Sequence, residues 1–289
     1  MATVDTELRT SARNDFMGLE VHDLSLAQVR EPALVDQLKK LLAHHAFLLF
    51  RDQRIDPAEQ IDFSRRLGPL EAHVLSDFCL PGHPEIFVVS NIVENGRHIG
   101  AYGGSKQFHT DLAYMPEPSM GSVFRCLECP AEGGETEFVS MAEAFDQLPA
   151  SERDWLRDQT AVYDYVWDYP RRQSHRPPLS DAQKRAVPPV SHPCVRRHPE
   201  TGRESIFLTP IWIRRLEGMD EDASARRVGE IIDFATSPRF RYAHRWQPGD
   251  ILIWDNRSTL HRQLPFDDVK ERRLMHRTTI RGERPLAPA

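Results

Sequence analysis

The chain has 289 residues, of which 40% are hydrophobic and 28% charged, and its formal net charge is −6 at pH 7. This length suits one large domain with a sizeable core, and the interspersed charges exclude the basic stripe expected of a nucleic-acid-binding surface. The N-terminal stretch is polar, which argues against a signal peptide, and no long apolar run is present that could span a membrane. Four cysteines are too few for a disulfide framework, so we expect a cytoplasmic protein.

The first part of the chain predicts helices and strands in close succession. Apolar residues at helical spacing indicate a helix over residues 32–45, and the apolar run at 46–50 is typical of a buried strand. A second helix is expected over 57–67, with Pro57 in its first turn. Further along, we expect strands at 85–92, 122–130 and 133–141 and a short helix at 141–149.

The second part opens with a segment of different composition. Residues 168–190 are rich in proline and charge, and we expect a loop-rich, lid-like insertion within a single domain that covers 1–289. After it we expect a hairpin at 196–208, a helix at 223–236 and strands at 249–256 and 272–282. No βαβ alternation with a glycine-rich phosphate loop is present, which disfavours a doubly wound fold. We therefore predict a mainly β fold with flanking helices, of the sandwich or jelly-roll type.

The stretch QFHTDLAYMPEP contains a candidate pair of metal ligands, His109 and Asp111. A chain with 13 His carries a His-x-Asp pair by chance, so the pair needs partners before it indicates a site. On a strand, side chains two positions apart point the same way and can converge on one ion, and two His with one carboxylate suit Fe(II). His261, which follows an apolar strand and a Trp-Asp-Asn turn, is favoured as the distant ligand, with His244 and His276 as alternatives.

Two other pairs compete with this one for a metal, His83 with Glu85 and His198 with Glu200. Each has a proline between its members, which disfavours chelation from a strand because proline removes a ladder donor. The C-x-x-C sequence CLEC has no second pair of cysteines to complete a zinc site, and we expect it to lie on a strand or just after one.

Four motifs in the same order, FHTD, GGETEF, WDNRSTLHR and RRLMHRTT, resemble those of a known family. The chain is similar, from about Gly18 to Gly282, to the taurine dioxygenase and 2,4-dichlorophenoxyacetate dioxygenase (TauD/TfdA) family of Fe(II)/2-oxoglutarate-dependent dioxygenases. The resemblance implies a double-stranded β-helix of the jelly-roll, cupin-like type. It also implies that His109, Asp111 and His261 are the iron ligands and catalytic residues, and that an acidic third ligand supports oxygenation rather than halogenation.

The same resemblance assigns the co-substrate, 2-oxoglutarate, to two further residues. Its C5 carboxylate would be held by Arg273 and Thr136, although Arg272 remains an alternative to Arg273. Independently of the resemblance, Arg273, Arg277 and Arg281 stand at every fourth position of an expected strand. Even spacing puts all three on one face, which we expect to line a charged cavity.

The resemblance also indicates how a prime substrate would be held. Arg277 matches the position that meets the anionic group of the substrate, and His73 falls where the taurine enzyme uses a His on the sulfonate. Trp212 could form part of an aromatic wall with Tyr163 and Trp167 or lie in the core. The residues directly after the His-Asp pair, from Leu112 to Tyr114, are expected to help select the substrate.

These inferences predict a dioxygenase that uses Fe(II), 2-oxoglutarate and O2 to hydroxylate a small organic anion, with release of succinate and CO2. An aryloxyalkanoate or similar carboxylate is favoured, and taurine or an alkylsulfonate is the alternative. A non-catalytic, anion-binding β-sandwich protein and a cupin-like zinc hydrolase or isomerase are the readings from other classes. Family members are often dimers or tetramers, so we expect a homo-oligomer, with neither nucleic acid nor membrane as partner.

Overall fold

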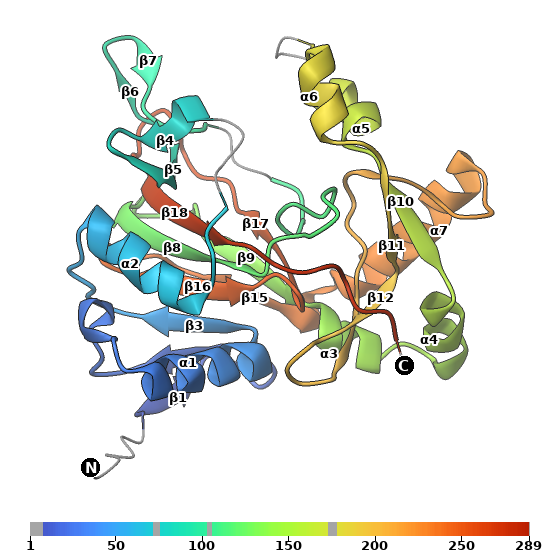
Figure 1. Cartoon of the computed structure of the whole chain (residues 1–289), viewed down its shortest axis with the longest axis horizontal. Coiled ribbons are helices and arrows are strands. Elements are labelled where there is room, and N and C mark those ends of the chain that lie inside the picture. The colour runs from blue at the N-terminus through green and yellow to red at the C-terminus, as the bar shows by residue number, and fades with distance from the viewer. Residues whose placement is uncertain (1–7, 72–75, 103–105, 173–177, 289) are drawn as a thin grey trace.

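The computed structural model describes residues 8–71, 76–102, 106–172 and 178–288 of the chain. Within these ranges the protein consists mainly of β-sheet with helices on its flanks (Figure 1). The largest sheet has eight strands in the order β1-β2-β3-β16-β8-β18-β5-β4. Strands β2 and β3 are parallel, and every other pair of neighbouring strands in this sheet is antiparallel. In that order the strands are Thr10–Ala12, Leu19–Val21, Phe47–Phe50, Ile251–Asp255, Gly121–Glu128, Leu274–Ile280, His83–Ser90 and Cys79–Leu80.

Smaller sheets complete the strand content of the described residues. A three-stranded sheet in the order β15-β9-β17 consists of Arg241–His244, Thr136–Ser140 and Thr259–Gln263. A second three-stranded sheet, β11-β10-β14, consists of Val190–Pro193, Thr160–Tyr163 and Ile213–Leu216. The two-stranded pairs are β12–β13, at Val195–Arg197 and Glu204–Ile206, and β6–β7, at Val93–Glu94 and Arg97–His98.

Most of the helices gather at two sides of the molecule, and α3 lies between them (Figure 1). Figure 1 shows α1 and α2 along the large sheet and α4 to α7 beyond the smaller sheets. The α-helices are Pro32–His45, Pro57–Leu67, Met141–Asp146, Ala150–Arg157, Tyr165–Arg172, Asp181–Ala186 and Glu221–Ala235, and 3-10 turns lie at Leu26–Gln28, Ser76–Phe78 and Pro238–Phe240. No helix in the described part of the chain has the length and apolar character needed to cross a membrane.

The start of α2 illustrates how local sequence determines a helix. The side chain of Asp56 accepts a hydrogen bond from the backbone N–H of Glu59, and the Glu59 carboxylate accepts one from the backbone of Asp56, both at 2.8 Å. Pro57 occupies the first turn, where its missing N–H has no cost. The helix then buries Ile61 and Phe63 against the sheet, so capping and packing favour the same boundaries.

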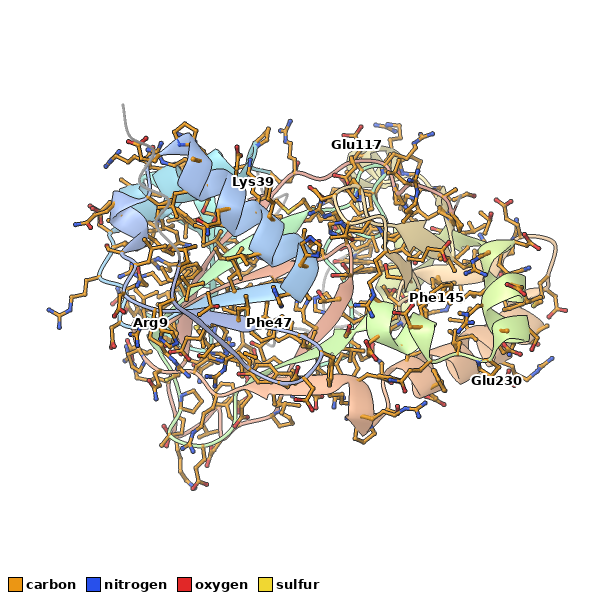
Figure 2. All side chains as sticks on the ribbon, turned by 90° about the horizontal axis from the view of Figure 1, so that it is seen from below. Arg9, Lys39, Phe47, Glu117, Phe145 and Glu230 are labelled. Atoms are coloured by element: carbon orange, nitrogen blue, oxygen red, sulfur yellow. The ribbon has the colours of Figure 1, made fainter. Side chains whose placement is uncertain are left out.

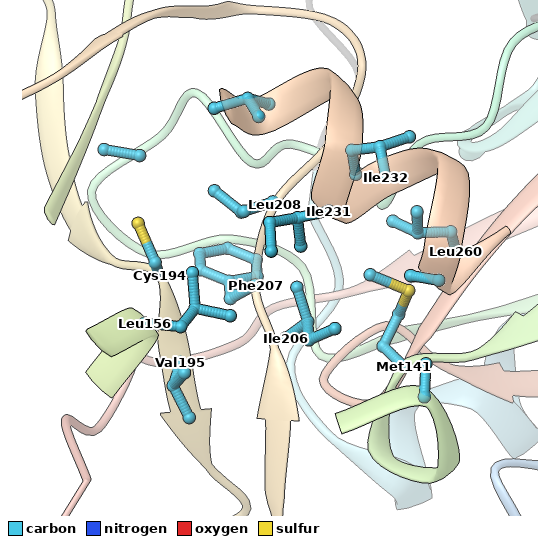
Figure 3. Close-up of a cluster of buried hydrophobic side chains, with 14 of the residues drawn as sticks. Met141, Leu156, Cys194, Val195, Ile206, Phe207, Leu208, Ile231, Ile232 and Leu260 are labelled. Carbon is cyan, nitrogen blue, oxygen red and sulfur yellow. The ribbon is translucent and has the colours of Figure 1, made fainter. Parts of the chain in front are cut away.

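The two sheets that will matter for the site pack face to face. Phe47 of β3 stacks on Phe138 of β9 with ring centroids 5.4 Å apart, and Phe138 also contacts Trp254 of β16. A separate cluster of buried side chains fills the other half of the molecule, where Ile231 of α7 lies near Phe207 (Figure 3). Figure 2 marks the two halves by Phe47 in one cluster and Phe145 in the other.

Most of the expected elements are present, and the differences have local causes. The helices expected over 32–45 and 57–67 and the hairpin within 196–208 are confirmed. The segment 168–190 contains more helix than expected, because the end of α5 and all of α6 lie in it. The start of α6 is a capping box of Ser180 and Gln183, a sequence signal that the proline content obscured.

Gly121, at the start of β8, leaves no room for a side chain. An added Cβ would lie 2.3 Å from the carbonyl oxygen of Trp254, a backbone atom that cannot move without disturbing β16. We expect Gly121→Ala to lower the free energy of unfolding by about 1–3 kcal/mol, measured by urea denaturation. The matched control is Gly229→Ala in α7, where the added Cβ would meet no atom within 4 Å apart from its chain neighbours and the backbone of its own helix, and it should raise this free energy by about 0.5–1 kcal/mol. Similar changes of the unfolding free energy in both variants would contradict the close approach of Gly121 in β8 to the backbone of β16.

Candidate functional site

Three potential metal ligands meet where the two facing sheets come together. The Nε2 atoms of His109 and His261 each lie 3.9 Å from Oδ1 of Asp111, and the two imidazole centroids are 4.3 Å apart. Their ligand atoms all lie within 4.8 Å of one another, and these residues form the one group of this kind among the described residues. The structure therefore brings together the three residues that the sequence singled out.

The local geometry differs from the expected strand. His109 pairs with His261 through two backbone hydrogen bonds of 3.0 and 2.8 Å, but this is an isolated bridge, and Asp111 already belongs to a turn. The hydroxyl of Thr110 donates to the backbone carbonyl of Asn256 at 2.9 Å and ties this turn to the connection between β16 and β17. Asp111 thus reaches the imidazoles through a turn, not through the alternation of a strand.

The Asp111 carboxylate is held from behind by residues that the sequence analysis missed. Its Oδ2 accepts hydrogen bonds from the hydroxyl of Ser122 at 3.1 Å and, at 3.4 Å, from Nδ2 of Asn256, whose Oδ1 accepts from the Trp254 indole at 2.9 Å. Oδ1 faces the imidazoles and accepts from Nη1 of Arg277 at 3.1 Å. The Trp-Asp-Asn motif contains Asn256, but the motif by itself indicates only a turn.

The charge states in this group suit a divalent cation. Burial favours the protonated form of the Asp111 carboxylate, but the charge of Arg277 and the hydrogen bond from Asn256 outweigh it and hold the pKa of Asp111 well below its usual range. Burial lowers the pKa of His261 to about 3 and also lowers that of His109. Nδ1 of His109 lies 3.1 Å from the carbonyl oxygen of Gln107, which favours the tautomer with a free Nε2 lone pair. Two neutral imidazoles and one carboxylate form the donor set of a non-haem Fe(II) site with open positions.

A cavity of about 170 Å³ adjoins this group. Its lining residues are Phe87, Val89, Ala101, His109, Phe124, Thr136, Trp254, His261, Arg262, Gln263, Arg273 and Arg277. Two of the expected 2-oxoglutarate ligands, Thr136 and Arg273, therefore share one cavity with two of the expected iron ligands.

Arg273 has a buried guanidinium that no carboxylate of the described residues neutralises. It is only 3% exposed, and its side chain makes one hydrogen bond within the described residues, from Nε to the carbonyl oxygen of Gly134 at 3.3 Å. No carboxylate pairs with Arg273 in the described part of the chain, and burial lowers the pKa of its guanidinium to about 10. Its guanidinium also lies 5.7 Å from the Phe124 ring centroid. Because an isolated buried charge is costly, this position fits a ligand with a carboxylate.

The neighbouring arginines divide between the cavity and the surface. Arg272 is exposed and bonded to Glu128 at 2.8 Å. Arg277 lines the cavity, as expected, but Arg281 is exposed and bonded to Glu71 at 3.0 Å, so the expectation for Arg281 was wrong. β18 ends at residue 280, and the alternation of a strand no longer determines where a side chain beyond it points.

Aromatic side chains stand on the other side of the His-Asp group. The Trp212 ring lies edge-on to His109 with centroids 6.2 Å apart, and Tyr114 contacts both Trp212 at 4.9 Å and Tyr165 at 4.4 Å. Leu112 and Trp212 both have positive φ, at 59° and 69°, a conformation that costs a side-chain-bearing residue about 1–3 kcal/mol and concentrates at functional sites. Burial raises the pKa of Tyr114, so its hydroxyl stays protonated.

Two other candidates for substrate contact, Tyr163 and Trp167, lie elsewhere. His73 falls outside the described residues. Tyr163 is fully buried in the core, where its hydroxyl donates to the carbonyl oxygen of Phe207 at 2.9 Å. Trp167 lies on α5 beneath the guanidinium of Arg171, 4.0 Å from the ring centroid.

The competing metal ligands are also accounted for. His244 and His198 each lie within hydrogen-bonding distance of a buried aspartate, at 3.1 and 3.0 Å. His276 and His83 belong to strands of the large sheet. In the described ranges none of these four joins a group of ligands that could hold a metal ion.

Comparison with known proteins yields one consistent set of relatives. Residues 7–279 match the model of the family described as "Taurine catabolism dioxygenase TauD, TfdA family". The chain is 29% identical to an alpha-ketoglutarate-dependent 2,4-dichlorophenoxyacetate dioxygenase from Burkholderia sp. (strain RASC), over 94% of each chain. It is 30% identical to an (S)-phenoxypropionate/alpha-ketoglutarate-dioxygenase from Sphingobium herbicidovorans, over 92% of each. A solved taurine dioxygenase from Burkholderia xenovorans matches with a TM-score of 0.79 and 25% identity, covering 97% of this chain and 93% of that one.

The Asp111 carboxylate supplies the one anionic donor of the group, which suggests a direct test. We expect Asp111→Ala to weaken binding of Mn(II), an air-stable substitute for Fe(II), by more than about 100-fold, beyond the loss typical of an outer partner. Titration calorimetry measures this affinity. His192→Gln is the control, because His192 is buried and bonded to the Met115 carbonyl but lies outside the group. Unchanged affinity in Asp111→Ala would refute the metal site.

Asn256 should influence the metal only through Asp111. We expect Asn256→Ala to weaken Mn(II) binding by about 10–100-fold, because the carboxylate would lose a partner that orients it. The control is Asn14→Ala, which removes an amide whose oxygen accepts backbone hydrogen bonds from Phe16 and Met17 and is bonded to none of the three ligands in the described part of the chain. Equal Mn(II) affinities for these two variants would show that Asn256 does not orient the carboxylate.

Proposed function

This chain belongs to the taurine catabolism dioxygenase TauD, TfdA family, and we propose that it is a 2-oxoglutarate-dependent dioxygenase that hydroxylates an aryloxyalkanoate or a similar small carboxylate. The observation that carries the proposal is the buried guanidinium of Arg273, which has no carboxylate partner in the described residues and shares a cavity with His109 and His261. That arrangement suits a co-substrate with a carboxylate at one end and a metal-chelating group at the other.

In this proposal His109, Asp111 and His261 hold Fe(II). Two imidazoles and one carboxylate would leave coordination positions open for a 2-oxoacid and O2. When bound, the iron would activate O2, so that one oxygen atom enters succinate as 2-oxoglutarate loses CO2 and the other oxygen atom hydroxylates the substrate. The protein contributes by keeping both imidazoles neutral and the carboxylate ionised, so that all three donors are ready to bind.

Arg273 and Thr136 would hold the C5 carboxylate of 2-oxoglutarate. A charge-assisted hydrogen bond from a guanidinium is stronger than one between neutral groups, and burial strengthens it further. Phe124 and Phe87 line the same cavity and limit access of water. Arg272 is the weaker candidate, because its guanidinium is exposed and already bonded to Glu128.

The prime substrate would lie between a cation and an aromatic wall. Arg277 lines the cavity, and within the described residues its guanidinium hydrogen-bonds only through Nη1, to Asp111, which leaves it partly free for a second anion. Trp212, Tyr114 and Leu112 offer apolar surface beside His109. A carboxylate on an aromatic ether, the chemistry named for two of the relatives, fits this pair of surfaces better than a small aliphatic sulfonate does.

Several further inferences about the fold and the assembly accompany the proposal. The packing of the sheet β15-β9-β17 on the large sheet supports a double-stranded β-helix of the jelly-roll, cupin-like type. A single domain over 1–289, a lid function for 168–190, a homo-oligomer and a cytoplasmic location stay predictions. A role for His73 on the substrate anion also stays one.

Succinate release from a panel of substrates tests the proposal. The purified chain with Fe(II), 2-oxoglutarate and O2 should release succinate with aryloxyacetates or phenoxypropionate faster than with taurine or a longer alkylsulfonate. His261→Ala should release none, and Arg277→Ala should raise the KM for the carboxylate by about 10–100-fold, the effect of losing a charged hydrogen bond. Faster turnover of taurine would favour the sulfonate alternative. Anion binding without succinate from any substrate would favour the non-catalytic one.

A further inference from the structure

Trp246 contacts Thr136 from behind the co-substrate cavity, and this contact has no role in the function proposed above. This residue follows β15, is only 5% exposed, and donates its indole N–H to the hydroxyl oxygen of Thr136 at 3.0 Å. No other side-chain hydrogen bond of either residue occurs in the described part of the chain. Trp246 does not line the cavity, whereas Thr136 does.

The direction of this hydrogen bond determines what the Thr136 hydroxyl can do next. An indole N–H can only donate, so the threonine oxygen must accept. With one lone pair occupied, the hydroxyl hydrogen remains available for an acceptor on the cavity side. A carboxylate accepts only, so this hydroxyl and the guanidinium of Arg273 would both act as donors to it.

The indole itself is held between a residue that lines the cavity and a buried His-Asp pair. Its ring stands edge-on to His244 with centroids 4.5 Å apart and to Phe124 at 5.5 Å. The His244 ring nitrogen Nε2 lies 3.1 Å from Oδ2 of Asp250, which also accepts from Arg51 at 2.7 Å. Because His244 and Asp250 are each at most 1% exposed, the indole has little freedom to turn its N–H elsewhere.

From these contacts we infer that Trp246 is a positioning residue that orients the Thr136 hydroxyl toward the C5 carboxylate of 2-oxoglutarate. The inference rests on the proposed role of Thr136 and Arg273 in co-substrate binding. It assigns part of the preference for a 2-oxoacid with a distal carboxylate to a side chain that never touches it. Without the indole, the hydroxyl could rotate among its staggered positions and would lose the preset direction of its hydrogen.

A purely structural role for Trp246 is the competing explanation, since a buried indole needs an acceptor of its own. The two explanations differ in how Trp246 and Thr136 combine. If the indole acts through the hydroxyl, removing the hydroxyl first should leave nothing for the indole to orient. If the indole only supports the fold, its loss should weaken binding to the same extent in either background.

A double-mutant cycle on 2-oxoglutarate binding separates them. The full-length chain loaded with Mn(II) is titrated by calorimetry as wild type, Trp246→Phe, Thr136→Val and the double variant. We expect Trp246→Phe to weaken 2-oxoglutarate binding by about five-fold, the effect of one neutral hydrogen bond, and to cause no further loss in the Thr136→Val background. Trp155→Phe, on α4 beneath Arg227, is the matched control and should bind as wild type does.

Oxalate serves as a second probe, because it chelates the metal but has no distal carboxylate. Its affinity for the Mn(II)-loaded chain should be the same in the wild type and Trp246→Phe. In turnover, Trp246→Phe should raise the KM for 2-oxoglutarate and leave the KM for the prime substrate unchanged.

Each outcome of this experiment decides the inference. Equal losses in both Thr136 backgrounds, a matching loss for oxalate, or unchanged 2-oxoglutarate affinity in Trp246→Phe would overturn it while leaving the proposed function intact. A wild-type chain that binds Mn(II) but not 2-oxoglutarate would overturn the proposed function and this inference together.

Discussion

Asp255 lies fully buried at the end of β16, where it accepts hydrogen bonds from Arg257 at 2.7 Å and pairs with His198 at 3.0 Å. A buried carboxylate without partners would cost several kcal/mol, so these contacts determine the path of the turn that follows. Burial opposes its ionisation, yet Arg257 and His198 hold the pKa well below its usual range. The turn leads from the large sheet into β17 of the facing sheet, and its next residue, Asn256, reaches Asp111.

The site therefore depends on a connection between sheets and not on any single strand. β16 brings Trp254, whose indole orients Asn256, and β17 brings His261 directly opposite His109. Two rigid sheets with a short link hold these groups more accurately than a mobile loop would. This explains how a turn carrying Asp111 can still present its carboxylate at a defined distance from both imidazoles.

The positively charged side chains around the cavity outnumber the carboxylates that pair with them. Asp111 offsets Arg277, but Arg273 has no anion of its own among the described residues, and both imidazoles are neutral. Such a site carries the cost of a buried cation until a carboxylate enters, which favours anionic ligands by complementarity. The hydroxyl of Thr136, turned by Trp246, adds a directional donor to this electrostatic preference.

Periodicity and capping in the sequence determined the helices over 32–45 and 57–67, because those signals are local. The motifs also identified the His-Asp-His set, since their residue types and order carry the chemistry. Only the tertiary structure decided that Arg281 faces solvent instead of the cavity that Arg273 lines, and that Asn256 orients the Asp111 carboxylate. Those outcomes depend on where a strand ends and which sheets face each other, and such long-range packing leaves no periodic trace in the sequence.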